Sequence, residues 1–134
     1  MQINLKKCFL SIFAVFAFIF VFDFIVHGFL LKDTYMQTQS LWRPESEGMM
    51  WVMFASQFLY ATFVTSFFIR LLAGRSKHVA IHFGFYLGII VAAMKLGVYA
   101  YMPLPFMLVA SWMFAAFLLN LGIGFILSFT YKTE

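Results

Sequence analysis

Four long apolar runs dominate the chain, and only short polar or proline-containing stretches separate them. The runs cover residues 8–31, 49–72, 79–101 and 104–129. Each approaches or exceeds the ~20 residues that a helix needs to cross the ~30 Å hydrocarbon layer of a bilayer. Apolar residues do not alternate with polar ones, as they would in a membrane β-barrel. We therefore predict an all-α fold, an antiparallel four-helix bundle that forms a single transmembrane domain over residues 1–134.

The long connector lies between the first and second runs, at residues 32–48. It is polar and carries Tyr35 and Trp42, two residue types suited to the headgroup layer. We expect it to contain a short helix that lies on the membrane surface. Pro44 is expected to open the second spanning helix, because a first helical turn does not use the N–H that proline lacks. The two glutamates that follow Pro44 would then lie where the helix dipole favours negative charge.

Composition agrees with lipid as the main solvent of the side chains. Hydrophobic residues make up 64% of the chain and charged residues 10%, whereas soluble domains carry about 25% charged residues. Cys8 is the one cysteine, so no intramolecular disulfide is possible. Lys6 and Lys7 ahead of the first apolar run imitate a secretory signal. No small-x-small cleavage site follows that run, so we expect it to be a retained first span.

Basic residues gather on one side of a four-span topology. The short connectors at 74–77 and 102–105 predict antiparallel neighbouring helices. The side that holds the termini would carry six basic residues, and the opposite side would carry two: Lys6, Lys7, Arg70, Arg75, Lys77 and Lys132 against Lys32 and Arg43. The positive-inside rule then predicts that both termini are cytoplasmic. Because these charges lie at helix ends, the net charge of +4 indicates no nucleic-acid partner.

Asp23 and Lys95 are the two charged residues well inside the apolar runs. Each costs a few kcal/mol at membrane depth unless it is paired or hydrated. With a helical rise of 1.5 Å per residue, Asp23 lies about 12 Å and Lys95 about 9 Å below the same outer boundary. Their matched depths predict a buried ion pair.

Further polar residues fall in the same layer. Gln57 on the second span matches the depth of Asp23, and Ser111 on the fourth span lies nearby. His27 lies one helical turn from Asp23, and Tyr99 lies one turn from Lys95. The sequence thus predicts a polar cluster with two open interpretations, a structural pair that fixes helix packing or a site for a ligand or ion. Its predicted members are Asp23, His27, Gln57, Lys95 and Tyr99.

Small residues mark a close packing face on the third span. Gly84 and Gly88 form a Gly-x-x-x-Gly pattern, and Ala92 continues the same face toward Lys95. This pattern allows close approach of membrane helices, and we expect it to act within the bundle, with dimerisation as the alternative. Asn120 on the fourth span is expected to form an interhelical hydrogen bond.

Metal ligation and catalysis find little support. Cys8, His78 and His82 lie at similar depth and could form a three-ligand zinc site, although a histidine pair of this kind is more typical of a hydrated helix edge. Met49 and Met53 could bind Cu(I), but methionine also fills apolar gaps. We favour no metal and expect no cofactor. No nucleophile with a base, phosphate loop or paired carboxylates is visible, so we expect no enzyme.

The chain resembles a group of uncharacterised small four-span bacterial inner-membrane proteins. The resemblance rests mainly on His27-Gly28 at the end of the first span and on Trp42-Arg43-Pro44 before the second span. Gly84 and Gly88, Tyr101-x-Pro103-x-Pro105 and the closing Tyr131-Lys132 extend it over nearly the whole chain. It implies a multi-pass protein of the bacterial inner membrane and implies no activity.

The resemblance also draws attention to the outer side, where Tyr35, Trp42 and Arg43 could form a cationic, aromatic mouth with His27 above the polar layer. Such a mouth could accept an anionic or lipid-like ligand, or it could anchor the loop at the interface.

Two functions follow from these observations. The sequence favours an accessory or interaction protein that packs with itself or with a larger membrane partner, because 20 phenylalanines give extensive apolar surface. The alternative is a small transporter or ligand-binding protein that uses the outward-facing polar cluster.

Overall fold

Helices make up most of the structure. The computed structural model describes residues 4–72 and 76–131, and no β-strand occurs within these ranges. The elements, in chain order, are α1 (Leu5–Ile25), η1 (Val26–Leu30), α2 (Lys32–Gln37), η2 (Gln39–Leu41), η3 (Glu45–Glu47), α3 (Met50–Leu72), α4 (Lys77–Val98) and α5 (Phe106–Thr130). Four helical segments are long and apolar enough to cross a membrane: α1 with η1, α3, α4 and α5. The prediction of an all-α, four-span bundle is confirmed.

The first span begins and ends with identifiable local features. The side chain of Asn4 accepts a hydrogen bond from the backbone N–H of Lys7, which caps α1 and explains its start at Leu5. At the other end the helix widens into the π-helical turn η1, where the N–H of Leu31 donates to the carbonyl of Val26 over 2.9 Å. Turns of this kind occur frequently at functional sites.

The long connector differs from its prediction in one respect. It contains the expected short helix, α2, but Pro44 begins the 3₁₀ turn η3 and not the second span. The chain is extended at Gly48, and α3 begins at Met50. The two glutamates therefore belong to η3, and the first turn of α3 has no acidic residue.

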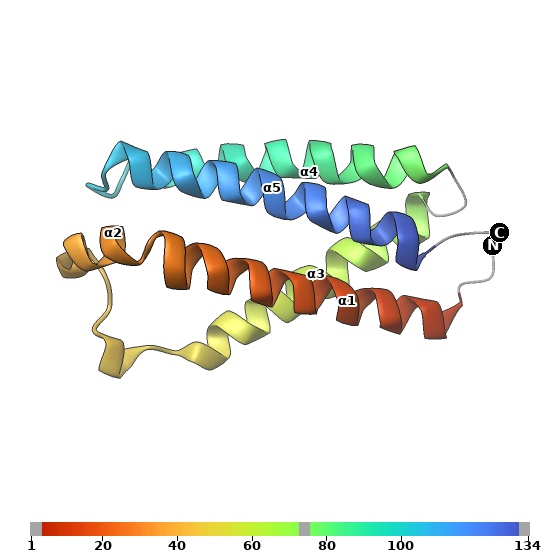
Figure 1. Ribbon diagram of the computed structural model, residues 1–134, viewed down its shortest axis with the longest axis horizontal. Helices are drawn as coiled ribbons and strands as arrows, with labels where there is room; N and C mark the ends of the chain where they lie inside the picture. The colour runs from red at the N-terminus through yellow and green to blue at the C-terminus, as the bar shows by residue number, and fades with distance from the viewer. Residues whose placement is uncertain (1–3, 73–75, 132–134) are drawn as a thin grey trace.

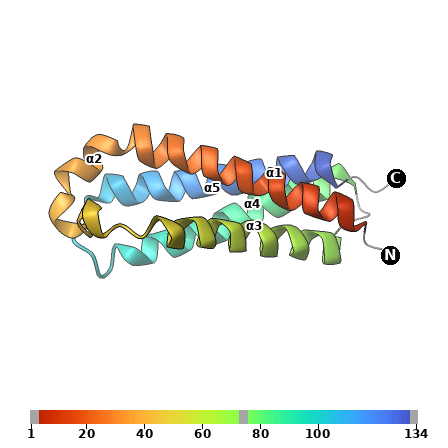
Figure 2. The ribbon, with the colours of Figure 1, turned by 90° about the horizontal axis from the view of Figure 1, so that it is seen from below.

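The four spanning helices form two pairs (Figure 1). α4 and α5 pack against each other along most of their length, and α1 packs against α3 and α5. By contrast, α3 contacts α4 only slightly. Figure 1 shows α3 near α4 at one end and far from it toward the end that carries α2, which we call the loop end. Figure 2 shows α1 and α3 side by side from below. The bundle is therefore loosely closed along one side, the α3–α4 seam.

Glycine explains why α4 and α5 lie so close. A Cβ atom at Gly88 would lie 2.9 Å from the backbone oxygen of Phe117. A Cβ at Gly84 would collide with the backbone oxygen of Asn120 and lie 2.9 Å from the Cα of Gly124. Gly84 and Gly88 are buried against α5, and Ala92 is half-buried farther along α4. The small-residue face thus packs inside the bundle.

Two apolar clusters hold the ends of the bundle. The larger one lies in the half that contains the start of α1 and the end of α5, which we call the terminal end, and includes Val15, Ile69 and Ile123. There the backbone N–H of Asn4 also donates to the hydroxyl of Tyr131 over 3.3 Å. The smaller cluster, around Leu108, lies at the loop end.

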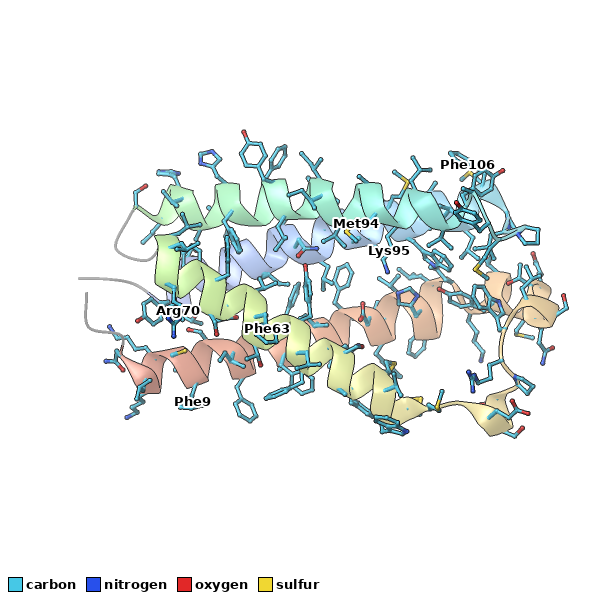
Figure 3. The ribbon with its side chains drawn as sticks, turned by 180° about the vertical axis from the view of Figure 1, so that it is seen from behind. Phe9, Phe63, Arg70, Met94, Lys95 and Phe106 are labelled. Carbon is cyan, nitrogen blue, oxygen red and sulfur yellow. The ribbon has the colours of Figure 1, made fainter. Side chains whose placement is uncertain are left out.

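The outer surface of the spans is apolar. Phe9 and Phe63 are 64% and 67% exposed, and Figure 3 labels them on α1 and α3. Side chains of this kind on all four spanning helices are suited to lipid contact. Of the basic residues used to predict orientation, Arg75 and Lys132 lie outside the described residues.

Candidate functional site

A cavity of about 450 Å³ lies inside the bundle toward the loop end. Its size falls within the range typical of ligand pockets. All five α-helices and η1 contribute to its wall, and six of its polar side chains are Asp23, His27, Tyr35, Gln57, Lys95 and Asn120. Four of the five predicted cluster members therefore line one cavity.

Asp23 and Gln57 form one polar wall. Nε2 of Gln57 donates to Oδ2 of Asp23 over 2.8 Å, which joins α1 to α3. Gln57 is only 7% exposed, and its Oε1 has no hydrogen-bond partner. A buried acceptor without a partner costs about 1–3 kcal/mol. This oxygen is therefore an unsatisfied acceptor behind the wall that Asp23 and Gln57 form, with almost no accessible surface of its own.

Lys95 lies on a different wall. Figure 3 shows its side chain extending from α4 toward the interior of the bundle, and the residue is exposed. Asp23 and Lys95 line the same cavity, but within the described ranges no ion pair joins them. The predicted buried ion pair is therefore wrong. Its physical reason is the loose α3–α4 seam, which leaves Lys95 on α4 apart from the Asp23–Gln57 pair.

His27 belongs to a hydrogen-bonded chain at the loop end of the cavity. The indole N–H of Trp112 donates to the hydroxyl of Tyr35 over 2.7 Å, and that hydroxyl lies 2.6 Å from Nδ1 of His27. Because the indole can only donate, the Tyr35 oxygen is the acceptor of the Trp112 bond, while the direction of the bond between Tyr35 and Nδ1 of His27 depends on the histidine tautomer. Burial raises the pKa of Tyr35 above 10.0; the Trp112 hydrogen bond lowers it, and the charge of Asp23 raises it.

Aromatic side chains close this end. The ring of Trp42 lies edge-on to Tyr35 and to Trp112, with centroid separations of 5.6 and 5.9 Å. Its indole N–H donates to Oγ1 of Thr38 over 2.8 Å. Tyr35 and Trp42 thus meet as the predicted mouth requires. Arg43 is exposed and does not line the cavity, so the cationic part of the predicted mouth is wrong.

Tyr60 and Asn120 line the cavity at its other end. Tyr60 was not among the residues predicted from the sequence. The Tyr60 hydroxyl donates to Oδ1 of Asn120, and Nδ2 of Asn120 donates to the carbonyl of Ala116 over 2.8 Å. The first bond joins α3 to α5. Tyr60 lies three residues after Gln57, so helical spacing was the signal that could have found it. Trp112, also missed, gave no comparable signal.

Tyr99 is the one predicted cluster member outside the cavity. It follows the end of α4 at Val98, is 44% exposed and stacks edge-on against Phe106 with centroids 5.6 Å apart. The expected helical turn between Lys95 and Tyr99 is incomplete because the chain bends there toward α5. Ser111, which the sequence placed near the same layer, is also outside the cavity lining: its hydroxyl donates a hydrogen bond to the carbonyl of Met107 in its own helix.

The three candidate zinc ligands do not come together. Within the described residues, no three His, Cys, Asp or Glu side chains gather closely enough to hold a metal ion. Cys8 packs against the larger apolar cluster, whereas His78 and His82 are exposed on α4. Met49 and Met53 lie near the start of α3 and are 45% and 38% exposed.

These observations define a multi-pass helical membrane protein with a polar cavity between its spans. No family model, curated protein or solved structure matches the chain. The case for a function therefore rests on the cavity and its chemistry.

Proposed function

We propose that this chain is a non-catalytic membrane protein that binds a small ligand in the polar cavity between its spanning helices. The observation that carries the proposal is a space of about 450 Å³ whose walls hold a carboxylate and an ammonium group that are not paired with each other. A structural pair would bring Asp23 and Lys95 into contact, because each charge is costly at membrane depth. Their separation across a cavity supports ligand binding.

The lining offers both kinds of hydrogen-bonding group. The carboxylate of Asp23 can accept hydrogen bonds, while Lys95 can only donate them. Leu119 and Val91 add apolar surface nearby. A few polar groups set in an apolar wall are typical of ligand sites.

The accessory role that the sequence favoured becomes the second candidate. Its support is the exposed aromatic surface, including Trp51 at 70% and Phe63 at 67%, but lipid contact accounts for such a surface equally well. We place the chain in the bacterial inner membrane with both termini in the cytoplasm, so that the loop end faces outward. The bias of basic residues toward the terminal end supports this orientation.

The proposal can be tested with a substitution that fills the cavity. Ala115 lines it on α5, so Ala115→Phe should occupy ligand space, whereas Ala93→Phe places the same side chain on an exposed position of α4. Each protein would be extracted in gentle detergent and examined by native mass spectrometry. We expect wild type and Ala93→Phe to retain a bound small molecule and Ala115→Phe to lose it. Retention by both variants alike, or no bound molecule in wild type, would contradict the proposal.

A further inference from the structure

A second hollow lies on the same seam as the polar cavity. It also measures about 450 Å³, and it is formed by α3 and α4 in the terminal half of the bundle. Its wall is almost wholly apolar and includes Phe67 of α3 and Phe83, Leu87 and Ile90 of α4. We call it the apolar groove. On α4 it ends at Ile90, and the lining of the polar cavity begins at the next residue, Val91.

The two hollows together match the shape of an amphiphile. Along α4, Leu87 lies about 12 Å from Lys95 at 1.5 Å per residue. One leaflet of a ~30 Å hydrocarbon layer is about 15 Å thick, so an acyl chain of ordinary length would reach from the polar cavity well into the groove. α3 and α4 make few contacts with each other, and both helices line both hollows, so lipid can approach the two hollows between these helices.

The charges of the cavity specify the headgroup. Lys95 would bind an anionic group such as a phosphate, while the carboxylate of Asp23 would accept hydrogen bonds from an ammonium group. We infer that the ligand is a phospholipid with a zwitterionic headgroup that carries a primary ammonium, held with its head in the polar cavity and a chain in the apolar groove. This inference rests on the proposed function of the cavity.

A quaternary ammonium provides the sharpest comparison. A trimethylated headgroup has the same charge and a similar phosphate, but it has no N–H to donate to the carboxylate of Asp23. We therefore expect phosphatidylethanolamine to bind about tenfold more tightly than phosphatidylcholine, a factor that corresponds to 1.4 kcal/mol. Binding to purified protein in detergent would be measured by native mass spectrometry with each lipid added in turn.

Two pairs of variants test the two parts of the site. Lys95→Met should weaken phosphatidylethanolamine binding at least about tenfold, whereas Lys32→Met, at an exposed position of α2, should leave it unchanged. Ile90→Trp fills the groove, and Ile89→Trp alters its exposed neighbour outside the groove. We expect Ile90→Trp, but not Ile89→Trp, to weaken binding of the diacyl lipid.

Free phosphoethanolamine separates this inference from the proposed function. If it binds as tightly as the lipid and Ile90→Trp has no effect, the lipid assignment is overturned while the cavity proposal stands. Equal binding of phosphatidylcholine and phosphatidylethanolamine would overturn the headgroup assignment. If neither lipid nor phosphoethanolamine binds and Ala115→Phe retains whatever wild type retains, both proposals fail.

Discussion

Replacement of Gly84 by alanine should loosen the α4–α5 pair and disturb the cavity beside it. The added methyl group would collide with the backbone oxygen of Asn120 and lie within 2.9 Å of the Cα and N of Gly124. Backbone atoms cannot rotate away as a side chain can, so the two helices must separate. Overpacking of this kind costs about 1–3 kcal/mol.

Gly97 provides the matched control on the same helix. A Cβ there meets nothing within 4 Å, and alanine is favoured over glycine inside a helix by up to about 1 kcal/mol. Gly97→Ala should therefore leave the free energy of unfolding unchanged or slightly higher, while Gly84→Ala lowers it. We expect the two variants to differ by about 2 kcal/mol or more.

The measurement is reversible unfolding in mixed detergent micelles, followed by circular dichroism as the fraction of denaturing detergent rises. Ligand retention by native mass spectrometry would be recorded for the same samples, because separation of α4 from α5 also moves Lys95 relative to Asn120. If Gly84→Ala unfolds within about 0.5 kcal/mol of Gly97→Ala, the close backbone contact described above is not what holds the two helices together.

Three further outcomes can be checked on the same preparation. Trp112→Phe removes the donor to Tyr35 and should lower the free energy of unfolding by about 1 kcal/mol; a neutral result would show that this bond adds nothing. Burial raises the pKa of Tyr35 above 10.0 in the folded state. The contribution of Tyr35 to the free energy of unfolding is therefore complete below its pKa in the unfolded chain and is lost as pH rises through its pKa in the folded protein. Difference absorbance of tyrosinate, with Tyr35→Phe as the control, should show that Tyr35 ionises at higher pH than an exposed tyrosine, and ionisation at the usual pH would refute this prediction. Tyr60→Phe leaves Oδ1 of the fully buried Asn120 without its donor and should cost about 1–3 kcal/mol in unfolding, a loss that Asn120→Leu in the same background should partly relieve.

The spanning helices could be predicted from sequence because their signal is local. A continuous apolar run leaves a helix as the one way for a single segment to satisfy its backbone in lipid. The errors lie where the signal is weaker. Pro44 suits the first turn of an α-helix and a 3₁₀ turn equally well, and the extended backbone at Gly48 postponed the start of α3 to Met50.

The polar layer was predictable only in part. Helical spacing places His27 near Asp23 and gives the depth of Gln57, and all three line the cavity. Depth along a helix, however, does not fix the distance between two helices. The expected contact between Asp23 and Lys95 depended on how closely α1 and α4 approach, and the depths of the two residues within their runs do not give that separation.

The loose α3–α4 seam follows from where the small residues lie. Gly84 and Gly88 let α4 approach α5 closely along most of their length. α1 contacts α3 through side chains, including the Asp23–Gln57 bond, and α3 carries no glycine. Lys95 is carried on the tight pair and Asp23 on the other pair, so the helix pairing itself keeps the two charges apart. Close packing of α4 on α5 thus leaves a cavity between the two pairs of helices, with Asp23 and Lys95 on separate walls of it.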